Sequence, residues 1–215
     1  MKKSMLISLL LTHFYFLASA QWNMYLQGGF SPSIHPGNSD LMVNREDPME
    51  TFLFNVSVSR SEYFVGLNAR RPLNNQFFTE IGAVYTKGVN QYKLSYLVPK
   101  GADSYQERTE CDHQILFPFG IGAKIDALEF TGGFQVAWTV SHQCGLQAIE
   151  GYDEQTNPLQ FGWHSGVQFN FDKMIAGIEY RAQFKRMCSG MYVNGQSLEL
   201  MNMSGRFSFK VQFPL

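Results

Sequence analysis

Thirteen residues near the C-terminus alternate strictly between apolar and polar side chains. In residues 201–213 every odd position is apolar or glycine, and every even position is polar. Successive side chains of a β-strand point to opposite faces of a sheet, so this pattern predicts a strand with one apolar and one polar face. A long strand of this kind that ends in Phe213 is typical of barrels that close within a membrane, because a closed barrel leaves no unpaired strand edge in lipid.

The same alternation recurs in seven earlier segments, so the chain is predicted to form eight strands. These segments are residues 22–30, 63–69, 77–85, 115–124, 128–140, 161–171 and 176–185. Alternating segments of this length predict an all-β fold, in the form of an eight-stranded antiparallel up-and-down β-barrel that crosses an outer membrane.

One segment leaves the strand count open. The even positions of residues 52–58 are apolar, whereas the strand that follows is apolar at odd positions from Tyr63 onward. Either residues 59–62 form a turn or a β-bulge shifts the register between the two segments. We expect the bulge, because one extra strand would give an odd total of nine. The segment can instead pair with residues 92–96, as an extension of the hairpin that turns at residues 71–75. A ten-stranded barrel is the remaining alternative.

The predicted connections alternate between short and long. Short links at residues 71–75, 125–127 and 172–173 alternate with long polar links at 32–48, 88–110, 141–158 and 187–197. Outer-membrane barrels have short periplasmic turns and long outer loops, so we expect the long links at the cell surface. Aromatic residues then form two girdles, with Trp22, Phe77, Phe130, Phe171 and Phe213 at one end and Phe30, Tyr85, Trp138, Phe161 and Phe184 at the other.

The N-terminal residues are typical of a secretory signal peptide. Two lysines precede a mostly apolar run at residues 5–17, and the small residues 18–20 supply a cleavage site. We therefore expect residues 1–20 to be removed and residues 21–215 to form a single outer-membrane barrel domain.

The composition has few charges. Charged residues make up 16% of the chain, below the ~25% usual in soluble proteins, as lipid-facing surface would produce. The formal charge of -1 becomes -3 when the two lysines of the signal peptide are removed, so nucleic-acid binding is not indicated. The alternative is a secreted soluble β-sandwich or lipocalin-like barrel, which alternates in the same way but with its apolar face inward.

Several stretches rich in glycine and proline add a more specific pattern. They are Gly66-Leu67, Arg71-Pro72-Leu73, Phe78, Gly82, Tyr85-Thr86-Lys87-Gly88, Ile115-Leu116-Phe117-Pro118-Phe119, and Gly162 with Gly166. In these residues the chain resembles the outer-membrane β-barrel family of Bacteroidota that includes PorT-like proteins. Pro214 and Leu215 depart from the aromatic end usual in that family. The resemblance implies an eight-stranded barrel in contact with outer-membrane lipid, inserted by the barrel-assembly machinery. For PorT-like members it also implies a part in type IX protein secretion alongside secretion-system proteins.

The polar face of the predicted strands carries ionisable residues. Those expected to face inward are Glu80, Glu129, Glu179, Arg181, Arg206 and Lys210, together with Arg70, Lys124 and Lys185. An eight-stranded barrel has room only for its own side chains. We therefore expect the first six to form an internal ion-pair network rather than to line a channel.

The residue spacing supports no catalytic, cofactor or metal site. Ser165 follows His164 on a predicted strand and faces the opposite way, so the two cannot act as nucleophile and base. Three histidines and three cysteines could in principle bind a metal ion, but they lack the close spacing of metal ligands. These residues are His113, His142, His164, Cys111, Cys144 and Cys188. We predict a non-enzymatic barrel with functional surface loops and a PorT-like role in secretion or envelope assembly. A lipid-modifying enzyme, or a small transport or binding barrel, is the alternative.

The three cysteines are expected at the same end of the barrel. Cys111 begins a predicted strand, whereas Cys144 and Cys188 lie in long links. A disulfide between Cys144 and Cys188 would join two neighbouring links and leave Cys111 free. Pairing of Cys111 with Cys144 is a second possibility, and three free thiols are the third.

Overall fold

The structure, a computed structural model, describes residues 22–32, 38–43, 51–56, 61–97, 104–148, 152–184, 188–193, 196–197 and 205–215. The predicted signal peptide therefore lies outside the described residues. The strands are β1 (Asn23–Ser31), β2 (Asn38–Val43), β3 (Thr51–Val56), β4 (Ser61–Pro72), β5 (Phe77–Leu97), β6 (Ser104–Ile125), β7 (Leu128–Cys144), β8 (Tyr152–Thr156), β9 (Leu159–Phe171), β10 (Met174–Gln183), β11 (Cys188–Val193), β12 (Gln196–Ser197) and β13 (Gly205–Pro214). A 3-10 turn, η1 (Gly145–Ala148), follows β7. Within these ranges no helix is long and apolar enough to span a membrane.

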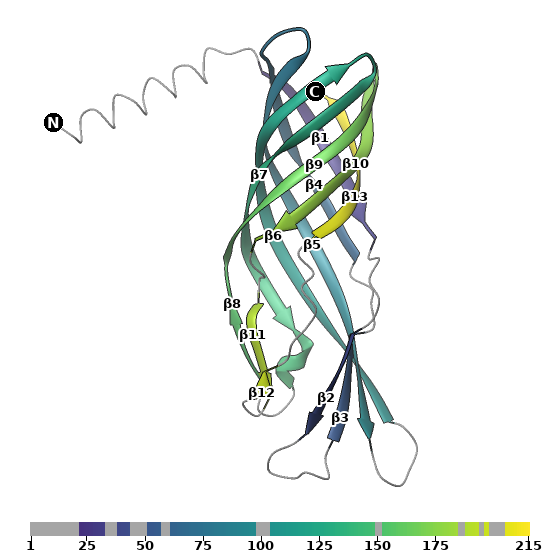
Figure 1. Cartoon of the computed structure of the whole chain (residues 1–215), viewed down its shortest axis with the longest axis vertical. Helices are drawn as coiled ribbons and strands as arrows, with labels where there is room; N and C mark the ends of the chain where they lie inside the picture. Colours follow the sequence, from purple (N-terminus) through teal and green to yellow (C-terminus); the bar gives the residue numbers. More distant parts are fainter. Residues whose placement is uncertain are drawn as a thin grey trace, which may run out of the picture.

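Eight of these strands close into an antiparallel barrel (Figure 1). The order around the wall is β1, β4, β5, β6, β7, β9, β10, β13 and back to β1. The first and last wall strands pair from Tyr25 opposite Pro214 to Phe30 opposite Phe209, which leaves the wall without a free edge. The predicted eight-stranded antiparallel up-and-down barrel is confirmed, and each of the eight predicted segments falls on one wall strand.

The ambiguous segment forms a strand outside the barrel wall. β3 pairs with the far half of β5, where Phe52 lies opposite Tyr96 and Phe54 lies opposite Leu94. The alternative pairing with residues 92–96 is therefore confirmed. The region of the expected bulge includes residues 57–60, which lie outside the described residues. The ten-stranded barrel is wrong, because β2 and β3 extend the sheet along β5 beyond the closed ring.

All four predicted long links contain regular structure, which corrects the expectation of polar loops. The ladder of β5 and β6 continues through residues 88–97 and 104–110, from Val89 opposite Cys111 to Tyr96 opposite Ser104. The other three links contain β2, then η1 and β8, then β11 and β12. A strand ladder continues beyond the barrel because its backbone N–H and C=O groups still gain partners there. We call these extensions the projections; they leave one end of the barrel, and the short turns lie at the other (Figure 1).

The short turns contain residues suited to tight reversals. Asp126 begins the two-residue turn between β6 and β7 with a φ of 55°, a left-handed conformation that aspartate adopts more readily than most residues. Between β4 and β5 the Asn74 side-chain oxygen accepts hydrogen bonds from the backbone N–H groups of Gln76 and Phe77, both at 2.8 Å. These local contacts set the register of the flanking strands.

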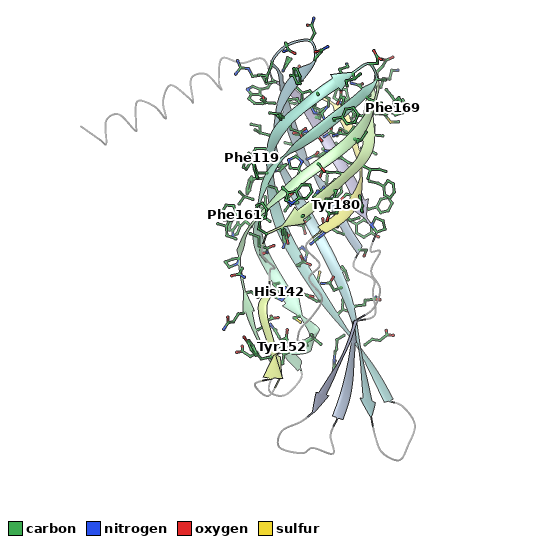
Figure 2. All side chains as sticks on the ribbon, in the orientation of Figure 1. Phe119, His142, Tyr152, Phe161, Phe169 and Tyr180 are labelled. Carbon is green, nitrogen blue, oxygen red and sulfur yellow. The ribbon has the colours of Figure 1, made fainter. Side chains whose placement is uncertain are left out.

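The barrel carries apolar side chains outside and polar ones inside (Figure 2). Each wall strand has an outward apolar side chain between 43% and 57% exposed, namely Leu26, Val65, Ile81, Phe119, Phe134, Val167, Ile178 and Phe209. Many inward polar side chains are at most 6% exposed, among them Gln27, Asn68, Glu80, Gln135, Gln168 and Lys210. The ten predicted girdle aromatics are exposed except for Trp22, which is half-buried. The lipocalin-like alternative is wrong, because it requires the opposite polarity.

A glycine inside the barrel makes room for an aromatic ring. Gly122 on β6 lies opposite Phe78 on β5, and a Cβ at Gly122 would overlap the Phe78 ring. The Arg70 guanidinium lies 4.8 Å from the centroid of this ring, a cation–π contact that favours the observed ring position. At Gly132 on β7, by contrast, the nearest atom to an added Cβ is 3.8 Å away.

We predict that Gly122→Ala lowers the free energy of unfolding by about 1–3 kcal/mol, because the added methyl group displaces a packed ring. Gly132→Ala is the matched control, and it should be neutral or stabilise by about 0.4–1 kcal/mol, because alanine restricts the unfolded chain. Urea unfolding of the purified barrel, followed by tryptophan fluorescence, measures both. Equal stability of the two variants would contradict the packing role of Gly122.

Candidate functional site

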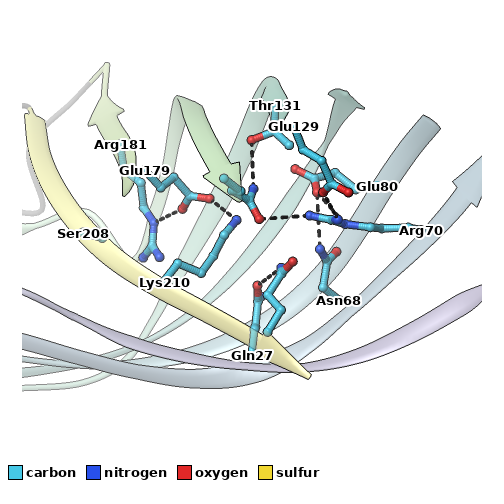
Figure 3. Close-up of polar contacts among 12 residues, drawn as sticks. Gln27, Asn68, Arg70, Glu80, Glu129, Thr131, Glu179, Arg181, Ser208 and Lys210 are labelled. Carbon is cyan, nitrogen blue, oxygen red and sulfur yellow. Dashed lines mark hydrogen bonds and ion pairs between the residues drawn. The ribbon is translucent and has the colours of Figure 1, made fainter. Parts of the chain in front are cut away.

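Two clusters of polar side chains are candidates for function. The interior network lies within the barrel and consists of Glu62, Arg70, Glu80, Glu129, Glu179, Arg181, Arg206 and Lys210. The rim cluster lies where β6, β7 and β8 leave the barrel and consists of Glu110, His142, Cys144, Tyr152 and Glu154. Figure 3 shows most of the interior network, and Figure 2 labels His142 and Tyr152 of the rim cluster.

Arg70 is the centre of one half of the interior network (Figure 3). Its Nη1 donates to Glu129 Oε2 at 2.6 Å, and its Nη2 donates to Gln168 Oε1 at 3.1 Å. Its Nε lies 3.5 Å from Glu80 Oε2, which also accepts a hydrogen bond from Asn68 Nδ2 at 3.3 Å. These partners compensate the buried guanidinium for its lost hydration.

Glu179 is the centre of the other half. It accepts hydrogen bonds from Arg181 Nε at 2.6 Å and from Lys210 Nζ at 2.5 Å. Arg181 Nη1 also lies 3.5 Å from Glu62 Oε1, and Arg206 forms an ion pair with the same carboxylate. The two halves together contain four acids and four bases, so the interior network carries no formal net charge.

The structure brings all six sequence-predicted residues into these two halves and adds Glu62 and Arg70. Arg70 already stood among the inward candidates, whereas Glu62 was assigned to a turn or bulge. In the structure Glu62 lies in β4 opposite Gly88, and it is 3% exposed. Among the other inward candidates, Lys124 is exposed, and Lys185 lies outside the described residues.

Little space remains beside the interior network. A void that Glu80, Glu179 and Lys210 line has a volume of about 10 Å³, which is room for roughly one water molecule. His164 lines the same void, and neither of its ring nitrogens makes a hydrogen bond within the described part of the chain. A buried water is the partner that this volume admits. The side chains fill this part of the interior, as expected for eight strands.

A β-bulge positions the rim cluster. Gln114 pairs with Thr139 but His113 pairs with Ser141, so the register of β6 and β7 shifts at Val140. A one-residue shift reverses the faces of all side chains beyond it. Even positions of β7 face outward within the wall and therefore turn to the inner face beyond the bulge.

The bulge places His142 between two carboxylates. His142 lies opposite Asp112 on β6, and Cys144 lies opposite Glu110. The Nδ1 atom of His142 is 3.6 Å from Glu110 Oε1, and its Nε2 atom is 3.2 Å from Glu154 Oε1. The side chains of the histidine and both carboxylates are at most 9% exposed. The imidazole is therefore nearly closed off from solvent, with an acid facing each nitrogen.

Tyr152 links the thiol to the second carboxylate. Its hydroxyl donates to Glu154 Oε2 at 2.7 Å and lies 3.5 Å from Cys144 Sγ. Gln147 Nε2 donates to Glu154 Oε1 at 2.9 Å. Burial raises the pKa of the Cys144 thiol to about 11, and burial together with these hydrogen bonds also raises the pKa of Tyr152. Both groups are therefore protonated at neutral pH in the structure as described.

The spacing of residues in the sequence did not indicate that the rim cluster contains possible metal ligands. One atom each from His142, Cys144 and Glu154 lies within 4.8 Å of the other two, although no metal site was expected. Glu154 comes from β8, in a stretch that was assigned to a loop. The available signal was the His-x-Cys spacing of residues 142–144, because side chains two apart on a strand share a face.

The structure describes the side chains of Cys111 and Cys144. Cys111 and Cys144 are free thiols, so the alternative bridge between them is not formed. Cys111 Sγ instead lies 3.6 Å from His113 Nε2. Cys188 lies opposite Thr156 in the pairing of β11 with β8, but its side chain is outside the described part of the chain. Because Cys144 is a free thiol, the predicted disulfide between Cys144 and Cys188 is not formed in the structure.

No protein-family model matches the chain, and no curated protein matches it.

We predict that Glu179→Gln lowers the free energy of unfolding by about 3–5 kcal/mol, because it leaves the buried Lys210 without its carboxylate. The double variant Glu179→Gln with Lys210→Gln should recover part of this loss, because the unpaired cation is also removed. Glu107→Gln, at an exposed site, is the control and should change stability by less than about 0.5 kcal/mol. Urea unfolding measures all three, and a double variant no more stable than Glu179→Gln would contradict the pairing.

Proposed function

We propose that this protein is a non-enzymatic outer-membrane β-barrel whose projections, rather than its interior, carry its function. The observation that supports this most directly is the polarity of the wall, which is apolar outside on all eight strands and polar inside. Soluble monomers rarely expose contiguous apolar patches larger than a few hundred Å². A hydrocarbon layer around the wall removes this surface from water, and a closed sheet leaves no backbone edge unpaired within it.

The lengths of the wall strands agree with a bilayer. A tilted transmembrane strand needs about 9–11 residues. β1 has 9 residues, and β10 and β13 have 10 each. Strands β5 and β6 are longer, with 21 and 22 residues, because they continue into a projection. We therefore assign the apolar part of the wall to the membrane and the projections to the water outside it.

The filled interior supports a role without conduction. Buried ion pairs centred on Arg70 and Glu179 occupy the barrel, and the void beside them holds about 10 Å³. A solute path would require these pairs to separate inside a narrow wall, which is costly for buried charges. The projections are then the parts available to a partner.

The more specific part of the proposal is a PorT-like accessory role in type IX secretion or envelope assembly. It rests on the resemblance of the chain to that barrel family and on the form of the projections. Among the described strands β2 has one hydrogen-bonded neighbour, β3. A strand with a second edge of this kind can add a strand from a partner protein, with backbone hydrogen bonds supplying affinity.

We predict that Phe209→Arg blocks assembly into the outer membrane. Phe209 points outward from β13 and is 46% exposed, and an arginine at mid-membrane depth costs roughly 2–4 kcal/mol. Phe209→Leu keeps the apolar surface and should assemble normally. Membrane fractionation with a urea wash, followed by immunoblotting, measures both variants. Wild-type protein that remains soluble in water without detergent would overturn the membrane proposal.

Disruption of the gene in the source bacterium tests the secretion role. We expect cargo of type IX secretion to be lost from the cell surface and to be restored by the wild-type chain but not by Phe209→Arg. Quantitative immunoblots of surface and periplasmic fractions measure this. Normal cargo at the surface would exclude the secretion role and would leave the barrel proposal unaffected.

A further inference from the structure

We propose that the rim cluster is a binding site for one divalent transition-metal ion of the Zn²⁺ type, held by His142, Cys144 and Glu154. Each residue offers one ligand atom, and the three atoms lie within 4.8 Å of one another. The site lies in a projection, beyond the apolar part of the wall. The inference therefore does not depend on the proposed membrane location or on a secretion role.

The donor set suits zinc. Imidazole nitrogen, thiolate sulfur and carboxylate oxygen are the three protein ligand types that Zn²⁺ takes, at about 2.0–2.3 Å. Two ligands at such distances on a tetrahedral ion lie roughly 3.3 Å apart, and His142 Nε2 and Glu154 Oε1 lie 3.2 Å apart. Magnesium and calcium prefer sites built from oxygen alone, so a site with sulfur and nitrogen disfavours them.

His142 is the residue that most directly indicates a missing ligand partner. Its side chain is 9% exposed, and neither ring nitrogen makes a hydrogen bond within the described residues. A buried imidazole without hydrogen bonds is unfavourable. Its Nε2 atom faces Glu154, and Cys144 follows two positions later on the same face of β7. A metal ion between these groups would satisfy the nitrogen and neutralise the carboxylate.

The surrounding residues have the positions of an outer ligand shell. Glu110 Oε1 lies 3.6 Å from His142 Nδ1, an ion-pair contact longer than a hydrogen bond, on the side of the ring where a carboxylate accepts the N–H of a metal-bound histidine. This contact would keep the lone pair of Nε2 directed at the metal ion. Tyr152 and Gln147 both donate to Glu154 and orient its carboxylate. The ligands are thus held from behind by side chains from β6, η1 and β8.

Coordination also accounts for the buried thiol. Cys144 is 5% exposed, and its Sγ atom faces the Tyr152 hydroxyl at 3.5 Å. Binding replaces the thiol proton with the metal ion, so this proton is released to solvent and a metal–sulfur bond forms, with no change in oxidation state. A neighbouring cavity of about 380 Å³, lined by His142, Tyr152 and Glu154 among others, leaves room for a water molecule as fourth ligand.

The test uses the full chain, purified in detergent without a histidine tag, stripped with a chelator and then titrated with Zn²⁺ in a calorimeter. We expect one ion per chain. Cys144→Ser, His142→Ala and Glu154→Gln should each weaken binding by more than the roughly 10- to 100-fold that loss of an outer-shell partner costs, and Glu110→Gln should fall within that range. Cys111→Ser is the matched control, since Cys111 lies outside the rim cluster, and it should bind as wild type does.

Titration of the same samples with Co²⁺ gives a second readout that does not depend on affinity. Wild type and Cys111→Ser should show a sulfur-to-cobalt charge-transfer band, and Cys144→Ser should lack it. Retained heat-dependent gel mobility of each variant establishes that the barrel is folded. Absence of Zn²⁺ binding by wild type, a cobalt band that survives in Cys144→Ser, or a disulfide between Cys144 and Cys188 in protein taken from cells would each overturn the metal site.

Discussion

Closure of the sheet between β1 and β13 is the constraint on which the rest of the structure depends. The two strands meet through six paired positions from Tyr25 to Phe30, so every wall strand has a neighbour on both sides. An open sheet with this apolar exterior would present unpaired backbone groups beside its apolar surface. Closure removes that edge, and it makes an apolar exterior compatible with a hydrocarbon surrounding.

Closure also determines what the interior can contain. Eight strands enclose a space that side chains alone fill, so the inward charges meet one another instead of water. Arg70 receives two carboxylates and an amide, and Glu179 receives two cations. The balanced charge of the interior network follows from this confinement, because an unpaired ion at such a depth is strongly destabilising. This packing supports the proposal that the barrel is a rigid support rather than a conduit.

The projections lie beyond the closed ring, so the constraints of closure and of a confined interior do not apply to them. Beyond the apolar wall, β5 and β6 continue as a hairpin, and a bulge at Val140 turns the end of β7 so that His142 and Cys144 face inward. Bulges at barrel rims commonly re-aim side chains. Here the result is a nearly buried histidine with carboxylates on both sides. The barrel wall, whose interior is filled by ion pairs, therefore also holds the rim cluster in place.

Alternation by itself determined which residues of each wall strand face outward, as for Phe209 against Lys210. The choice between eight and ten wall strands was decided only by the pairing of β3 outside the closed ring. Alternation is local, because successive side chains of a strand take opposite faces wherever the strand pairs. Partner choice is not local: Arg70 meets Glu129, 59 residues away, through the stagger of neighbouring strands. Glu62 joined the interior network, and residues 88–97 and 104–110 became strand, because of pairing across the sheet. His142 met Glu154 only because a one-residue shift at Val140 reversed the faces of β7, and such a shift depends on the partner strand rather than on the period of the sequence.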